Sequence, residues 1–228
     1  MSGVAVDGLE TGGRLVLHTY WRSSAAYRVR IGLNLKGLAW QPRPVHLLRE
    51  GGGQHHDAYR ALNPQQLVPT LVHDGRVLTQ SLAILDYLDE TFSGAPLLPA
   101  GALARARVRA LAQLVACDIH PLNNLRVMQH LQHEMAAPAS ARTGWTLHWM
   151  TDGLAALEAM LAGSADTGTF CHGDAPGMAD ACLVPQLYNA RRVGLDLQAW
   201  PTLRRIEAAC LALDAFDAAR PENQSDAE

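Results

Sequence analysis

Residues 69–88, PTLVHDGRVLTQSLAILDYL, carry the strongest fold signal in this chain of 228 residues. Two short apolar runs flank Asp74-Gly75, a dipeptide that favours the tight turn of a β-hairpin. Ser81 then begins a segment whose apolar residues recur at helical spacing on one side, namely Leu82, Leu85, Leu88 and Phe92. The stretch therefore predicts two antiparallel strands followed by a helix that packs against them.

The segments before this hairpin predict a strand, a helix and a second strand. Residues 14–20 form a short β-type run, residues 24–36 repeat apolar side chains at helical spacing, and residues 40–48 alternate enough for a strand. Two prolines in the last segment favour an edge position, because proline cannot donate to a sheet. Residues 14–92 thus have the order β-α-β-loop-β-β-α, which predicts a four-stranded mixed sheet of the thioredoxin-like type.

Beyond a linker at residues 93–100 the strand signals disappear. Residues 101–219 repeat alanine and leucine at helical spacing, and Pro121 predicts a kink or break within the first long stretch. We therefore predict an α/β thioredoxin-like domain at residues 14–92 and an all-α domain at residues 101–219. Residues 1–13 and 220–228 are expected to be flexible tails.

Composition restricts the class of protein. Hydrophobic residues make up 48% of the chain, charged residues 18%, and the formal net charge is −3, which indicates a folded soluble protein and gives no basis for nucleic-acid binding. No apolar run approaches the ~18 residues of a membrane span, and the acidic leader does not have the pattern of a secretion signal. The four cysteines form no CxxC pair, so we expect reduced core thiols in a cytoplasmic protein. His130 and His133 lie beside Glu134 but match no zinc motif, so no metal site is expected.

Two short motifs lie where predicted elements begin. Ser23-Ser24 lie at the start of the first helix, where unpaired N–H groups stabilise an anion, although serine is also an ordinary N-cap residue. Val68-Pro69 precedes the hairpin. Proline suits the first position of a strand, whereas a cis bond here would turn the Val68 N–H and C=O toward a ligand.

Two further groups have charge or hydrogen-bonding capacity. Gln80-Ser81 begins the helix after the hairpin, where an amide and a hydroxyl can hold a carboxylate and an amine together, or Ser81 is a plain cap. Arginines can bind a substrate with a carboxylate at each end through paired hydrogen bonds, or they are simply solvated surface charges. The arginines in question come from separate segments and are Arg22, Arg126, Arg191 and Arg192.

Taken together, five segments resemble the zeta class of glutathione transferases. YWRSSAAYRVRIGLNLKG at residues 20–37 is similar to the serine-containing signature of that family. The other segments follow in the family's order and are ALNPQQLVPTL (61–71), LTQSLAILDYL (78–88), ACDIHPLNNLRV (116–127) and ACLVPQLYNARR (181–192). The resemblance covers residues 14–217 and implies the glutathione transferase fold, glutathione as cofactor, a homodimer and a small-molecule dicarboxylate substrate.

The resemblance also implies residue roles. Ser23 would activate the glutathione sulfur with assistance from Ser24. The residues implied to bind glutathione are Ser23, Val68, a cis Pro69, Gln80 and Ser81, and those implied to bind substrate carboxylates are Arg22, Arg126 and Arg192. His46 is expected to meet a glutathione carboxylate because it ends the second predicted strand. His120 and Asn124, near Pro121, are expected to line the same cleft and bind glutathione, although His120 could equally be a core histidine. Two positions depart from the family pattern. Ala25 stands where Cys is frequent, and Gly177 stands where Thr usually caps a helix together with Asp180.

The implied activity is glutathione-dependent cis-trans isomerisation of maleylacetoacetate to fumarylacetoacetate, a reaction of aromatic amino acid (tyrosine) degradation. Reversible addition of a thiolate would make the double bond transiently single. The nearest alternative is the same chemistry on maleylpyruvate, and another is glutathione transfer to α-haloacids. A glutathione-binding protein without catalysis is the alternative from a different class, and the retained serine pair, Gln80-Ser81 and arginines argue against it.

Overall fold

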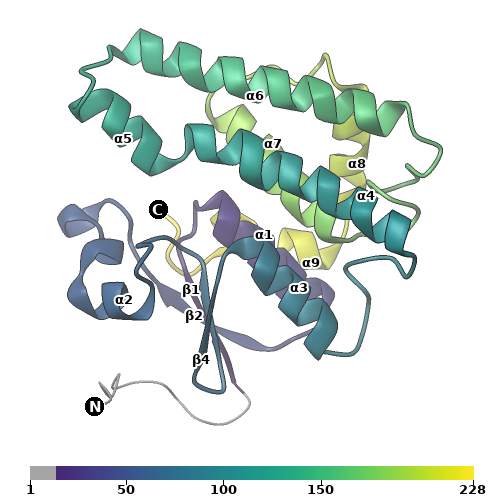
Figure 1. Ribbon diagram of the computed structural model, residues 1–228, viewed down its shortest axis with the longest axis horizontal. Coiled ribbons are helices and arrows are strands. Elements are labelled where there is room, and N and C mark those ends of the chain that lie inside the picture. Colours follow the sequence, from purple (N-terminus) through teal and green to yellow (C-terminus); the bar gives the residue numbers. More distant parts are fainter. Residues whose placement is uncertain (1–13) are drawn as a thin grey trace. The chain divides into compact units, whose positions relative to one another are not determined.

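The computed structural model describes residues 14–228, so the expected leader at residues 1–13 lies outside the described part. The chain divides into two compact units (Figure 1). The first unit holds the residues up to Gly94 together with Ala218–Glu228, and the second unit holds Ala95–Asp217. The end of the chain, which we expected to be a tail from residue 220, thus packs with the first unit.

The first unit is built on a four-stranded mixed sheet. Its elements are β1 (Leu15–Thr19), α1 (Ser24–Leu35), β2 (Trp40–Pro44), η1 (Arg49–Gly51), η2 (Gly53–His55), α2 (Asp57–Leu62), β3 (Thr70–His73), β4 (Arg76–Thr79), α3 (Ser81–Thr91) and η5 (Pro221–Asn223). The strand order is β2-β1-β3-β4, with β1 parallel to β2 and antiparallel to β3, and β3 antiparallel to β4. This topology confirms the thioredoxin-like order, the hairpin and the edge position of the proline-containing strand.

Alternation along β1 explains how the sheet acquires its core. Leu15 and Leu17 are buried and pack with residues from β3, α1 and α3, namely Val29, Leu33, Leu71, Ile84 and Leu88. Both helices therefore cover the same face of the sheet (Figure 1). Burial of each such side chain contributes about 1.5–3 kcal/mol, so this core holds both helices against the sheet.

The topology brings the segments that carry the predicted glutathione residues to one edge of the sheet. The carboxyl ends of β1 and β2 lie at the same edge because the two strands are parallel. β4 runs in that direction too, since β3 reverses the chain between β1 and β4. The start of β3 lies at this edge for the same reason. The N-termini of α1 and α3 and the loop after β2 consequently meet there.

The second unit, residues 95–217, contains helices joined by turns and loops and no strand. Its elements are α4 (Ala102–Gln113), η3 (Leu114–Ile119), η4 (His120–Asn123), α5 (Leu125–His133), α6 (Ala139–Ala162), α7 (Met178–Arg192), α8 (Pro201–Leu211) and α9 (Asp214–Asp217). The α4 helix continues into a π-helical turn, η3, and then into the 3₁₀ turn η4, which contains Pro121. The break predicted from Pro121 is therefore confirmed. The described residues contain no helix that is long and apolar enough to cross a membrane.

The glycine at the start of α7 has a packing reason. A Cβ atom at Gly177 would lie 2.7 Å from the Leu97 carbonyl oxygen, which accepts a hydrogen bond from Met178 N at 2.8 Å. Asp180 still accepts a hydrogen bond from Gly177 N at 2.9 Å and another from Cys171 N at 2.8 Å. Half of a capping box is thus retained where glycine allows the close approach of the Leu97 backbone.

Candidate active site

Ser23 is the N-cap residue of α1. Its backbone is extended, with φ −70° and ψ 117°, and its Oγ accepts a hydrogen bond from Ala26 N at 3.2 Å. A hydroxyl has two lone pairs and one proton, so capping through a lone pair leaves the proton for an acceptor at the helix N-terminus. The N-cap role and the anion-binding role are therefore compatible at Ser23. Ser24 lies in the first turn and is buried.

Arg30 holds the backbone that leads into Ser23. It is fully buried, and its guanidinium donates to Thr19 Oγ1 at 3.1 Å, to the Tyr20 carbonyl at 3.4 Å and to the Trp21 carbonyl at 2.9 Å. Burial lowers the pKa of Arg30 to about 10, an effect that the nearby charge of Asp226 opposes. A guanidinium with several donors thus fixes the β1–α1 loop. Sequence analysis missed this role, although a charge within the apolar helix 24–36 was a usable signal.

A second buried arginine contacts the start of α3. Arg28 Nη1 donates to Ser81 Oγ at 3.2 Å, and both side chains are buried. The N-cap position of α3 is occupied by Gln80, with φ 68°, so Ser81 is not the cap that one alternative suggested. Gln80 Nε2 donates to Gln65 Oε1 at 3.0 Å. The two side chains expected at the γ-glutamyl end of glutathione are thus held by contacts from α1 and from the loop before β3.

The Val68–Pro69 peptide bond is cis, as the resemblance implies. Val68 lies before the β1–β3 ladder, which begins with the pair His18 and Thr70, so its peptide group is outside the sheet register. The preceding loop is held by Tyr59, whose hydroxyl donates to the Leu67 carbonyl at 2.7 Å. The Val68 backbone therefore lies at the sheet edge next to the Ser23 loop.

His46 lies just beyond β2, at the same sheet edge, and its ring packs edge-on against Tyr20 at 5.1 Å between centroids. Arg22, the cation nearest to Ser23 in sequence, stacks over the Trp21 ring at 5.5 Å. The first unit thus brings together the segments of every glutathione residue predicted from residues 14–92. Arg22 adds a cation beside Ser23.

The second unit orients Arg192 through a chain of amides. Asn189 Oδ1 accepts from Arg192 Nη2 at 2.7 Å and from Arg192 Nε at 3.2 Å. Asn189 Nδ2 donates to Asn123 Oδ1 at 3.1 Å, and Asn123 Nδ2 donates to the Ile119 carbonyl at 2.8 Å. Sequence analysis missed Asn189, although its position three residues before Arg192 on one helix was a signal for contact.

The other predicted residues of the second unit have mixed surroundings. Asn124 is the N-cap of α5 and accepts from Val127 N at 3.2 Å. His120 is half-buried in η4, and Arg126 is exposed in α5. Arg191 forms an ion pair with the buried Glu207, which raises the pKa of the arginine and commits it to a structural contact.

Candidate metal ligands and thiols complete the description of residues 14–228. Residues 14–228 contain no cluster of three or more His, Cys, Asp or Glu side chains suited to a metal ion. Cys171, Cys182 and Cys210 are buried and unbridged, whereas Cys117 is exposed, which corrects the expectation that all four thiols lie in the core. Burial also raises the pKa of Cys171 and Cys210, so these thiols are poor nucleophiles.

Family models match both halves of the chain. The model for the glutathione S-transferase N-terminal domain matches residues 17–96, and the model for the C-terminal domain matches residues 150–222. The maleylacetoacetate isomerase of Rhizobium meliloti is 52% identical over 207 residues, which span 91% of this chain and 96% of that protein. The chain belongs to the glutathione S-transferase family.

Similar solved structures identify the class within this family, which is the zeta class. A holo structure of maleylpyruvate isomerase, described as a bacterial zeta-class glutathione S-transferase, superposes with a TM-score of 0.90 at 45% identity, covering 93% of this chain and 100% of that one. Maleylacetoacetate isomerase from Methylobacterium extorquens, solved with bound malonate and glutathione, also gives 0.90 at 46% identity, covering 93% and 99%. The glutathione S-transferase fold predicted from the sequence is confirmed.

Proposed function

We propose that this zeta-class glutathione S-transferase catalyses glutathione-dependent cis-trans isomerisation of maleylacetoacetate to fumarylacetoacetate. The observation that carries the proposal is the geometry of Ser23, whose hydroxyl caps α1 through a lone pair and keeps a proton to donate. Relatives that bear the name of this activity match over nearly their whole length, which supports the same assignment.

The residues at the sheet edge fit glutathione. The Val68 peptide group, outside the strand register, offers an N–H and a C=O to the cysteinyl part of the tripeptide. Gln80 and Ser81, at the N-terminus of α3, suit the γ-glutamyl carboxylate and amine. His46 lies at the same edge and suits the remaining carboxylate. His120 and Asn124 are proposed to assist from the second unit.

Bound glutathione supplies a thiolate that adds reversibly to the activated double bond and lets it rotate as a single bond. Ser23 donates its hydroxyl proton to the sulfur as a hydrogen bond, which favours the anionic form. The first-turn N–H groups of α1, including that of Ser24, add the positive end of the helix dipole. The protein's contribution is therefore to stabilise an anion at a fixed place rather than to move a proton.

Three arginine side chains are the proposed contacts to the substrate. Arg22, Arg126 and Arg192 are proposed to bind the two carboxylates of the diacid through charge-assisted hydrogen bonds. Asn189 orients Arg192, because its Oδ1 accepts hydrogen bonds from both Nε and Nη2 of the guanidinium. We further propose that the protein acts as a homodimer in the cytoplasm, in keeping with its family.

Maleylpyruvate is the second candidate substrate, since a maleylpyruvate isomerase has an equally high TM-score. Purified protein incubated with glutathione and each cis acid, followed by ultraviolet absorbance, distinguishes the two by kcat/KM. Turnover of neither acid would disprove the isomerase assignment.

The role of Ser23 is tested with Ser23→Ala and Ser23→Thr. Alanine removes the hydroxyl, and a hydrogen bond to a charged group is worth about 1.5–3 kcal/mol, so kcat/KM should fall about ten- to a hundredfold. Threonine keeps both the cap and the hydroxyl and should restore much of the activity. The absorbance of bound thiolate should fall in the alanine variant. Unchanged turnover in Ser23→Ala would show that the hydroxyl does not activate the sulfur.

A further inference from the structure

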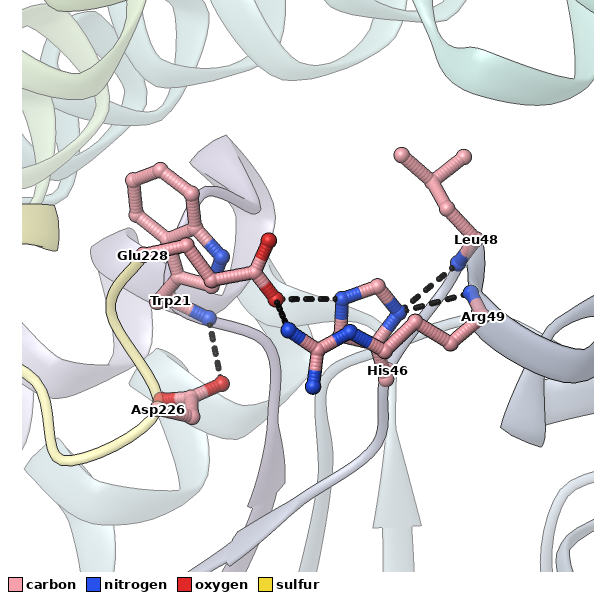
Figure 2. Close-up of polar contacts among 6 residues, drawn as sticks. All are labelled: Trp21, His46, Leu48, Arg49, Asp226 and Glu228. Atoms are coloured by element: carbon pink, nitrogen blue, oxygen red, sulfur yellow. Dashed lines mark hydrogen bonds and ion pairs between the residues drawn. The ribbon is translucent and has the colours of Figure 1, made fainter.

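The end of the chain contributes two carboxylates to the sheet edge of the first unit. Figure 2 shows Glu228 Oε1 between two donors, at 2.8 Å from His46 Nε2 and 2.7 Å from Arg49 Nη2. Asp226 Oδ2 accepts from Trp21 N at 3.0 Å, just before Ser23. Asp226 thus contacts the loop after β1, and Glu228 contacts the loop after β2.

The contacts of the imidazole assign its tautomer. His46 Nδ1 accepts from Leu48 N at 3.1 Å and from Arg49 N at 2.8 Å, so this nitrogen carries no proton (Figure 2). The proton must therefore be on Nε2, which donates to Glu228. Two backbone donors and the Tyr20 ring fix the imidazole before any ligand arrives. His46 is thus a fixed N–H donor aimed at a carboxylate.

The chemistry of this pair defines its ligand. A neutral N–H donor and a guanidinium on one short loop select a carboxylate, because a carboxylate accepts from both and neutralises the charge. Glu228 shows that a carboxylate oxygen can contact both donors at once. His46 and Arg49 therefore constitute a carboxylate site, and nothing in the chemistry of the site requires its occupant to come from this chain.

The position of the site connects it to the proposed glutathione residues. Val45, the neighbour of His46, packs in one apolar cluster with Tyr20, Tyr59 and Val68. A tripeptide whose cysteinyl part pairs with Val68 would therefore extend its glycyl end toward the loop that follows β2. The glycyl carboxylate of glutathione is of the class that His46 and Arg49 bind.

We propose that the Glu228 side chain is a built-in competitor of the glycyl carboxylate of glutathione at His46 and Arg49. The inference rests on the proposed function, since it assumes that glutathione binds at this sheet edge. Asp226, bound to Trp21 N, anchors the segment so that Glu228 stays close to the site. Glutathione must displace Glu228, whereas Asp226 retains the segment nearby.

The strength of the competition follows from exposure. The side chains of Arg49 and Glu228 are 69% and 43% exposed, and ion pairs in such surroundings contribute little. Glu228 therefore reduces the fraction of protein ready for glutathione only modestly, and its removal should tighten glutathione binding about two- to fivefold. Removal of Glu228 should not change the affinity for a ligand that lacks the glycyl carboxylate.

The test compares glutathione with its glycyl monoethyl ester, which lacks that carboxylate. Dissociation constants are measured by titration calorimetry for the full chain, Glu228→Gln and a control, Glu50→Gln. Glu50 is exposed and adjacent to Arg49. The control therefore removes one negative charge close to the site, as Glu228→Gln does, without removing a contact to His46 or Arg49. We expect Glu228→Gln to tighten glutathione about two- to fivefold, leave the ester unchanged, and differ from Glu50→Gln.

A second variant tests the cation directly. In the Glu228→Gln background, Arg49→Gln should weaken glutathione several-fold and leave the ester unchanged. Suppose that the full chain binds glutathione. The competition is then disproved, and the proposed function stands, if Glu228→Gln leaves the affinity for glutathione unchanged or raises the affinity for the ester by the same factor. If neither protein binds glutathione, both proposals are wrong.

Discussion

Arg30 links the fold to the candidate site, and we predict that Arg30→Met destabilises the protein strongly. Methionine is long and apolar, so the substitution removes the guanidinium without leaving a large cavity. The acceptors that lose their donor are Thr19 Oγ1 and the carbonyl oxygens of Tyr20, Trp21 and Ala219. Tyr20 and Trp21 lie in the β1–α1 loop that leads to Ser23, and Ala219 lies where the chain end returns to the first unit.

Two opposing effects set the magnitude. Each hydrogen bond from a charged donor contributes about 1.5–3 kcal/mol. Against this, burial lowers the pKa of Arg30 to about 10, and a shift of this size corresponds to about 3 kcal/mol spent on holding the charge inside the protein. Four such bonds contribute about 6–12 kcal/mol, which outweighs the cost of burial, so we expect the free energy of unfolding to fall by at least about 3 kcal/mol.

The measurement is equilibrium urea unfolding followed by tryptophan fluorescence and circular dichroism. Arg60→Met is the matched control, because Arg60 is exposed and has only a weak pair with Asp57 at 3.4 Å, so its loss should cost less than about 0.5 kcal/mol. Arg30→Lys keeps the charge but has one nitrogen for four acceptors, and it should lie between wild type and Arg30→Met. A value for Arg30→Met within about 1 kcal/mol of wild type would refute the reasoning.

Two further predictions concern orientation and pH. Asn189→Ala removes the acceptor that orients Arg192, so steady-state kinetics should show KM for the diacid raised about three- to tenfold with glutathione affinity unchanged, and an unchanged KM would contradict this. Burial, and then the charge of Arg43, lowers the pKa of His18, so the unfolded chain takes up this proton more readily and stability falls as pH drops below about 6.5. His18→Gln should flatten that decline in urea unfolding measured between about pH 7 and pH 5, and parallel slopes in the two proteins would disprove the assignment.

The parts of the fold that the sequence predicts are those governed by local patterns. The Asp74-Gly75 turn and the apolar spacing after Ser81 are short-range signals, and both elements form where expected. Pro121 breaks a helix because its ring and missing N–H act on its own turn, whatever surrounds it. Such signals do not depend on long-range packing, which is why they survive in the structure.

The parts that the sequence does not predict depend on partners far along the chain. Arg28 and Arg30 lie in a helix that sequence reasoning assigned from apolar spacing alone, and their burial becomes intelligible only through Ser81 and the β1–α1 loop. A charged residue at such a position predicts an acceptor, but the sequence does not say which one. The same holds for Asn189, whose amide joins two helices that are far apart in sequence.

The polar character of the chain end explains why its contacts are not predicted from the sequence and why they suit the proposed competition. Residues 220–228 are polar, so they lack the apolar periodicity from which packing is predicted. The contacts that place Asp226 and Glu228 are polar bonds to residues about 180–205 positions earlier, Asp226 to Trp21 and Glu228 to His46 and Arg49. Exposed polar contacts of this kind are weak, since water competes for both partners. Pro221 is buried and secures the start of the segment, whereas Glu228 at its end is held by exposed polar contacts alone. A ligand carboxylate can displace contacts of this kind, so the polar character that made the segment look like a tail also suits Glu228 to compete with glutathione.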